Sequence, residues 1–226
     1  MEQIISSIPP SILYLVDLAT FAFCIAILGI YQLRLQHRIR LNPAMTVQGM
    51  NARARSAWVR RVMTEKGLEI MAVQTLRNST MAATLMASTS VLLIFGILNF
   101  LVSADKIGPV FHSLNTWGAH APLLWIFKLI LALVDFFVAF FSFSLAVRGY
   151  HHAGYLVNVP MDTPDHGLTI EKVTQLMNRS GKYYSLGMRT YYFSVPLVLW
   201  LFGPLWMLLS SLALLAVLKH LDHLGD

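Results

Sequence analysis

Residues 123–147 read LLWIFKLILALVDFFVAFFSFSLAV, an apolar run with only two charged residues, Lys128 and Asp135. As a helix rising about 1.5 Å per residue, the run extends ~38 Å, enough to cross the ~30 Å hydrocarbon core of a bilayer. Three further runs are long enough to do the same: 12–33, 79–102 and 193–218. The sequence therefore predicts an all-α, polytopic membrane protein with four transmembrane helices.

The composition agrees with a chain whose solvent is largely lipid. Of the 226 residues, 56% are hydrophobic and only 12% are charged, which is too apolar for a soluble domain. None of the apolar runs alternates as the strands of an outer-membrane barrel do. The first run is expected to be a retained span, because the residues before it lack the basic region of a signal peptide. We expect one membrane domain over residues 1–226.

The basic residues predict how the chain is oriented. With four spans, the long loops 34–78 and 148–192 lie on the same side, and together they hold fourteen of the 17 Lys and Arg residues. Because Lys and Arg in such loops resist translocation, we expect both loops in the cytoplasm and both termini outside. The expected location is the bacterial inner membrane.

Both loops carry amphipathic segments. In NARARSAWVRRVM at 51–63, apolar residues recur at helical spacing opposite arginines, which predicts a helix lying at the membrane surface on anionic headgroups. Nucleic-acid binding by these arginines is the alternative, but stacking aromatic residues and a recognisable fold are missing, so no nucleic-acid partner is expected. A second surface helix is predicted at about 169–179, with Gly181 as its stop.

The second span is predicted to begin within a longer helix. Gly67 ends the pattern of the first amphipathic segment, and the helix after it should run without interruption into the span. One face of that helix is polar and is expected to look at protein: Gln74, Arg77, Asn78 and Ser88. A run of small residues would let another helix approach closely: Ser79, Ala83 and Ala87.

Asp17 and Lys128 are predicted to form an ion pair inside the membrane. Each lies five or six residues in from the external end of its span, and so ~8 Å deep from the same membrane face. A charge at that depth is costly unless it is paired. We expect the pair to fix the register of the two helices rather than to take part in chemistry.

Asp135 lies deeper, ~18 Å from the external face and near the bilayer centre. Ser88 is at a comparable depth in the second span, and Pro204 in the fourth releases the carbonyl of Trp200 from its helical hydrogen bond. Two interpretations remain open. Asp135 and Ser88 form the midplane site of a proton- or cation-coupled carrier, or Asp135 is a neutral acid hydrogen-bonded to a serine.

No pattern in the sequence supports catalysis. The nucleophile-elbow, phosphate-loop and zinc-protease motifs are missing, so we expect no enzyme activity. None of the eight histidines lies in a predicted span, and adjacent His151 and His152 point in different directions on a helix, so no haem, other cofactor or metal site is expected. The single cysteine, Cys24, excludes a disulfide within the chain.

Four segments resemble the domain-of-unknown-function 599 family of plant and bacterial membrane proteins: NARARSAWVRRVM at 51–63, AVQTLRNSTMAATLMASTS at 72–90, VRGYHHAGYLVNVP at 147–160 and LGMRTYYFSVPLVLWLFGP at 186–204. The resemblance extends from about Tyr31 to Leu218. It implies a shared multi-span architecture and no particular activity. Asp135 is not part of the family pattern, and the histidine doublet matches it only in half.

The resemblance also implies a set of retained positions near the cytoplasmic ends of the spans, which makes a candidate site for an anion or a lipid headgroup: Gln74, Arg77, Asn78, Arg148, His152, Arg189 and Tyr192. The alternative is that the three arginines only fix the topology. Our leading hypothesis is a non-enzymatic helical bundle that binds membrane lipids and a membrane protein partner or another copy of itself. The alternative is a small proton- or ion-coupled channel or carrier that acts as an oligomer.

Overall fold

The computed structural model describes residues 9–104, 106–108, 118–119, 121–159 and 167–222. This part of the chain is almost entirely helical, as the apolar runs predict. The elements in order are α2 (Pro10–Leu41), η1 (Pro43–Met45), α3 (Val47–Thr64), α4 (Glu69–Val102), α6 (Pro122–Leu156), α7 (Ile170–Leu199), η2 (Trp200–Phe202) and α8 (Pro204–Asp222). The chain is therefore an all-α, polytopic protein, in which α2, α4, α6 and α8 are long and apolar enough to cross a membrane.

Local sequence explains where several helices begin. The Thr46 hydroxyl accepts a hydrogen bond from the Gly49 amide at 3.2 Å and caps α3. Thr169 caps α7 in the same way, because its hydroxyl accepts from the Lys172 amide at 3.3 Å. Pro122 occupies the first turn of α6, where a missing amide hydrogen costs no helical bond.

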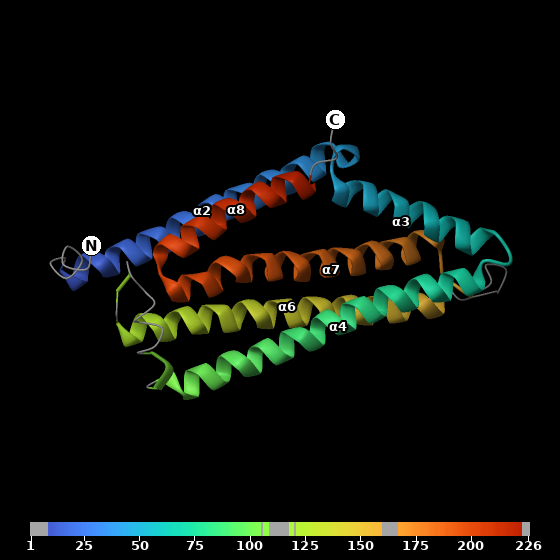
Figure 1. Cartoon of the computed structure of the whole chain (residues 1–226). Coiled ribbons are helices and arrows are strands. Elements are labelled where there is room, and N and C mark those ends of the chain that lie inside the picture. The colour runs from blue at the N-terminus through green and yellow to red at the C-terminus, as the bar shows by residue number, and fades with distance from the viewer. Residues whose placement is uncertain (1–8, 105, 109–117, 120, 160–166, 223–226) are drawn as a thin grey trace.

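Helix α6 lies between α4 and α7 and runs antiparallel to both (Figure 1). Two of the three small residues predicted to allow close approach, Ala83 and Ala87, lie at the α4–α6 contact. Ala83 is fully buried in one cluster with Ala146, and Ala87 packs with Ala139 and Phe143. The continuous helix predicted through the second span is confirmed as α4, and Gly67 forms the turn before it with φ +85°.

Helix α7 does not stop at Gly181, contrary to the prediction. It continues along α6 to Leu199, so that Tyr184 contacts Phe143 and Tyr191 contacts Phe136 through their rings. A Cβ on Gly181 would come within 2.6 Å of the Arg55 guanidinium. The glycine therefore allows α3 to approach α7 closely and does not end the helix.

The predicted fourth span, 193–218, is wrong, because these residues form parts of two helices. After η2, Gly203 adopts φ +129°, a conformation that L side chains rarely take, and Pro204 then begins α8. The chain reverses at this point, so α8 runs back along α7 (Figure 1). A hydropathy run alone does not distinguish one long helix from a hairpin of two shorter ones.

This reversal makes α8 parallel to α2. Phe21 packs in one cluster with Met207, and farther along the same direction the Tyr31 hydroxyl oxygen lies 2.9 Å from the Leu218 carbonyl oxygen. The first described turn of α2 and the last of α8 therefore lie at opposite ends of the helix pair (Figure 1). Both termini were predicted on the same side of the membrane because residues 193–218 were counted as a single crossing. The parallel course of α2 and α8 differs from that prediction.

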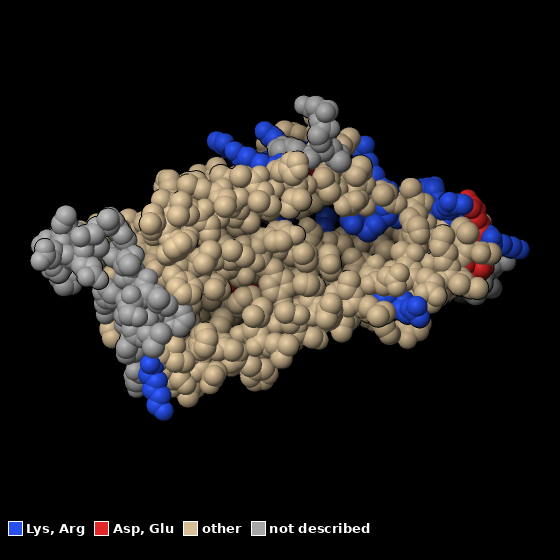
Figure 2. Space-filling model, in the orientation of Figure 1, with Lys and Arg blue, Asp and Glu red and all other residues tan. Residues whose placement is uncertain are grey.

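Helix α3 is present where the sequence predicts an amphipathic helix, but its apolar side packs on protein. Val59 and Val62 are buried in a cluster with residues of α4, α6 and α7, including Ala72 and Met177. The three outward arginines of α3 are exposed: Arg53, Arg60 and Arg61. Figure 2 shows Lys and Arg gathered toward the end of the molecule that α3 helps to form, over an otherwise apolar surface.

Candidate functional site

The structure brings the predicted partners Asp17 and Lys128 together. The Lys128 Nζ lies 2.9 Å from Asp17 Oδ1, and both side chains are buried. Asp17 also accepts hydrogen bonds from the Trp200 indole at 2.8 Å and from the Ala119 amide at 2.7 Å. Lys128 in turn donates to the Trp200 carbonyl at 3.1 Å. Because the two charges already have close protein partners, the pair is suited to holding helices together.

A second buried ionic group, here called the Arg189 cluster, joins α7 to α2 and α8. It consists of Tyr31, Gln32, Gln48, Arg189 and Asp222. Arg189 forms an ion pair with Asp222 and donates to the Gln32 side chain at 2.8 Å, while the Tyr31 hydroxyl donates to Asp222 at 2.7 Å. The Gln48 amide, turned so that its oxygen faces Arg189, accepts from the guanidinium at 2.9 Å.

Sequence reasoning singled out Arg189 but missed its acidic partner. Asp222 is 33 positions away in the chain, and a position in a short polar tail gives no sign that it folds back along α2. Only the reversal at Gly203 brings it to Arg189. No group of histidine, cysteine and acidic side chains in the described residues is arranged to hold a metal ion.

A third polar contact fixes α3 against α7. Arg55 donates through Nε to the Asn178 side chain at 3.1 Å, and Asn178 donates to the Ser56 hydroxyl at 3.1 Å. Burial lowers the pKa of the Arg55 guanidinium from its ordinary value. The guanidinium lies directly over Gly181, so this contact depends on the missing side chain there.

The predicted anion site is not assembled as one pocket. Arg189 is only 6% exposed and is bound by groups of α2 and α8, whereas Arg77 is exposed on α4, the helix that packs on α6 (Figure 1). The other predicted members of the site are not buried with Arg189. Tyr192 is half-buried, and four are exposed: Gln74, Asn78, Arg148 and His152. The expectation that the polar face of α4 looks at protein is wrong, because the small-residue face takes that role.

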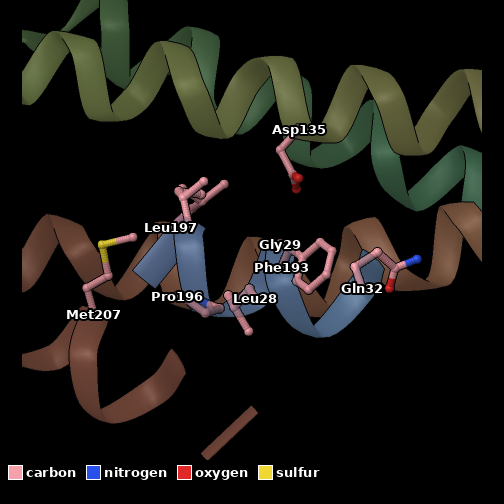
Figure 3. Close-up of a pocket in the computed structure, with 9 residues that line it drawn as sticks. Leu28, Gly29, Gln32, Asp135, Phe193, Pro196, Leu197 and Met207 are labelled. Atoms are coloured by element: carbon pink, nitrogen blue, oxygen red, sulfur yellow. The ribbon is translucent and has the colours of Figure 1, made fainter. Parts of the chain in front are cut away.

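Asp135 and Ser88 do not form a common site either. Ser88 is exposed on α4, while Asp135 projects from α6 toward α2 and α7 (Figure 3). The Trp200 carbonyl that was expected to be available accepts from Lys128. Depth along a helix predicted which residues share a level, but it did not predict which way each side chain points.

Asp135 instead lines a pocket of about 260 Å³ bounded by α2, α6, α7 and α8. The pocket wall is otherwise almost entirely apolar: Ile25, Leu28, Gly29, Phe193, Pro196, Leu197 and Met207, with Gln32 at one edge. The Asp135 Oδ2 atom is buried and has no hydrogen-bond partner among the described residues. Figure 2 shows this face hollowed between the α2–α8 pair and the helices beneath it.

Comparison with known proteins identifies the family by sequence. A family model described as "Protein of unknown function, DUF599" matches residues 19–225, nearly the whole chain. No curated protein and no solved structure matches. The family description names no ligand or reaction.

Proposed function

The chain belongs to this family of unknown function, and we propose that it is a non-enzymatic membrane protein that binds a bilayer lipid. The binding place is the pocket that Asp135 lines between α6 and α2, here called the Asp135 pocket.

The observation that carries this proposal is an apolar pocket in the lipid-facing part of the bundle. Leu28 and Met207 are almost fully buried at its wall, whereas Ile25 and Gly29 are exposed at its rim. Among helices that cross a bilayer, such an opening faces acyl chains rather than water. Apolar cavities hold water poorly, and an alkyl chain satisfies this wall better.

The carrier alternative has less support. A midplane ion site needs several polar groups around the acidic one, and here Ser88 faces away while the Trp200 carbonyl is engaged by Lys128. Around Asp135, the described wall offers only the Gln32 side chain as a further polar group. A pocket of this kind suits an amphiphile with a long apolar part and a small polar one.

We also propose that the basic end of the bundle lies in the cytoplasm of a bacterial cell, bound to the anionic headgroups of the plasma membrane. Because α8 runs parallel to α2, its Lys219 end joins the basic side. Lys106 is then the one basic residue outside the spans on the opposite side of the membrane. This distribution follows the positive-inside rule more closely than the four-span prediction does.

Native mass spectrometry of the protein released from its own membrane tests the lipid proposal. Gly29→Leu adds a side chain at the pocket rim, where a Cβ meets nothing within 4 Å, and Gly96→Leu makes the same change at an equally open position on α4. We expect one retained lipid per chain in the wild type and in Gly96→Leu, and none in Gly29→Leu. Equal lipid retention by both variants would refute the proposal.

A further inference from the structure

We propose that Asp135 selects the ligand of the pocket, which is a single-chain amphiphile from the bilayer whose head group donates a hydrogen bond. This inference rests on the proposed lipid-binding function and specifies the chemical class of the ligand. The head group is a hydroxyl or an ammonium, since both present a donor to a carboxyl oxygen.

The Asp135 carboxyl group has one unsatisfied oxygen. Its Oδ2 atom is shielded from solvent and lacks a partner in the described part of the chain, although the other intramembrane acid, Asp17, has a donor on each oxygen. A buried polar atom without a hydrogen bond is unfavourable. A ligand that brings a donor into the pocket removes this cost, and a hydrocarbon without one does not.

The Asp135 side chain points into the pocket. Asp135 extends from α6 across the pocket toward Gly29 and Phe193 on the facing helices (Figure 3). The carboxyl group therefore points into the space that a ligand would fill. An anionic head group is disfavoured here, because no Lys or Arg is among the described residues that line the pocket, so its charge would lack a counter-ion.

The pocket is small. Its volume of about 260 Å³ lies just below the range of about 300–1,000 Å³ that is usual for pockets of drug-sized ligands. This space suits one alkyl chain and is small for a lipid with two. The apolar wall then binds the alkyl chain of the ligand, and the Asp135 carboxyl group binds its head group.

Three photoactivatable dodecyl probes test the inference, each with a diazirine near the end of the chain. One carries a primary alcohol, one a primary amine and one a methyl ether, which has no donor. Crosslinked peptides are located by mass spectrometry. We expect alcohol or amine to label the pocket residues about tenfold more than the ether, a difference of ~1.4 kcal/mol in binding. The alcohol and amine arms show which donor is preferred.

Two variants connect this labelling to Asp135. Asp135→Leu should reduce labelling by alcohol and amine to the ether level, whereas Ser88→Ala, at an exposed position of α4, should leave it unchanged. If Asp135→Leu does not fold, Asp135→Asn serves in its place. An amide oxygen still accepts but is uncharged, so labelling by the amine should fall while labelling by the alcohol persists.

The outcomes separate this inference from the proposed function. Equal labelling of the pocket by all three probes would overturn the selection by Asp135 and leave lipid binding intact. Absence of pocket labelling by every probe would overturn both. Labelling by alcohol or amine that survives Asp135→Leu would also overturn the inference, because the donor would then have another acceptor.

Discussion

Lys128 on α6 donates a hydrogen bond to the main-chain carbonyl of Trp200, with 3.1 Å between the two atoms, at the residue where α7 gives way to the turn before α8. The same ammonium group pairs with Asp17 of α2. The Trp200 ring stacks on Phe21 with its centroid 4.6 Å away, and its indole donates to Asp17. The buried charges are therefore placed where the chain reverses, and they connect α2, α6 and the turn.

Removing Lys128 alone should destabilise the fold more than removing both charges. In Lys128→Met, Asp17 keeps a buried negative charge without its cation, and the loss of one partner of such a pair typically costs roughly 3–5 kcal/mol. In Asp17→Asn with Lys128→Met, no charge remains, so part of the stability should return. Denaturation in detergent measures both variants. A double variant less stable than Lys128→Met would show that the unpaired charge of Asp17 is not the main cause of the lost stability.

The membrane orientation can be read from single cysteines placed at exposed positions. On intact cells, an impermeant maleimide should label a cysteine at Lys106 and should not label one at Lys219 or Glu65 until the membrane is opened. The native Cys24 is buried, so the unsubstituted protein gives the background labelling. Labelling at Lys219 on intact cells would contradict the parallel arrangement of α2 and α8 across the membrane.

Glycine at 187 should be needed for the α6–α7 contact. A Cβ there would lie 2.8 Å from the ring of Phe143, which is itself held by Tyr184 and Tyr191, so Gly187→Ala should cost about 1–3 kcal/mol by overpacking. Gly154→Ala is the matched control on α6, because its Cβ has its nearest neighbour at 4.0 Å. Thermal unfolding compares the two. Equal melting temperatures for Gly187→Ala and Gly154→Ala would show that the α6–α7 contact does not require glycine at 187.

Asp222→Asn should loosen α8 from the bundle. The substitution leaves the buried Arg189 charge without its counter-ion, although Gln32 still accepts from it. Hydrogen exchange measured by mass spectrometry should become faster in the last turns of α8. His220→Gln, at an exposed position two residues earlier, is the control and should leave the exchange unchanged. Faster exchange in both variants would point to fraying of the helix end instead.

The sequence predicts those features that depend on depth or on length. Asp17 and Lys128 were paired because each lies a similar number of residues from the same membrane face, and their side chains do meet. The long apolar runs likewise predicted α2, α4 and α6. These features follow from the thickness of the bilayer and the rise of a helix, which are the same for every membrane protein.

Features that depend on rotation or on a change of direction were not predictable in this way. Ser88 and Asp135 lie at similar depths, yet they face away from each other because packing against α6 decides how α4 is turned. Pro204 indicated a carbonyl released from its hydrogen bond within one span, but the backbone conformation of Gly203 reverses the chain there. The Arg189–Asp222 pair exists only because of that reversal.

Contact between lipid chains and Met207 tests the central claim most directly. Met207 is 1% exposed and lines the Asp135 pocket, Met177 is 4% exposed and lies outside it, and Met81 is 62% exposed on α4. With labelled methionine methyl groups in lipid nanodiscs, acyl-chain protons should give nuclear Overhauser effects to Met81 and Met207 and none to Met177. If Met207 gives none, like Met177, no lipid chain occupies the pocket and the proposed function is wrong.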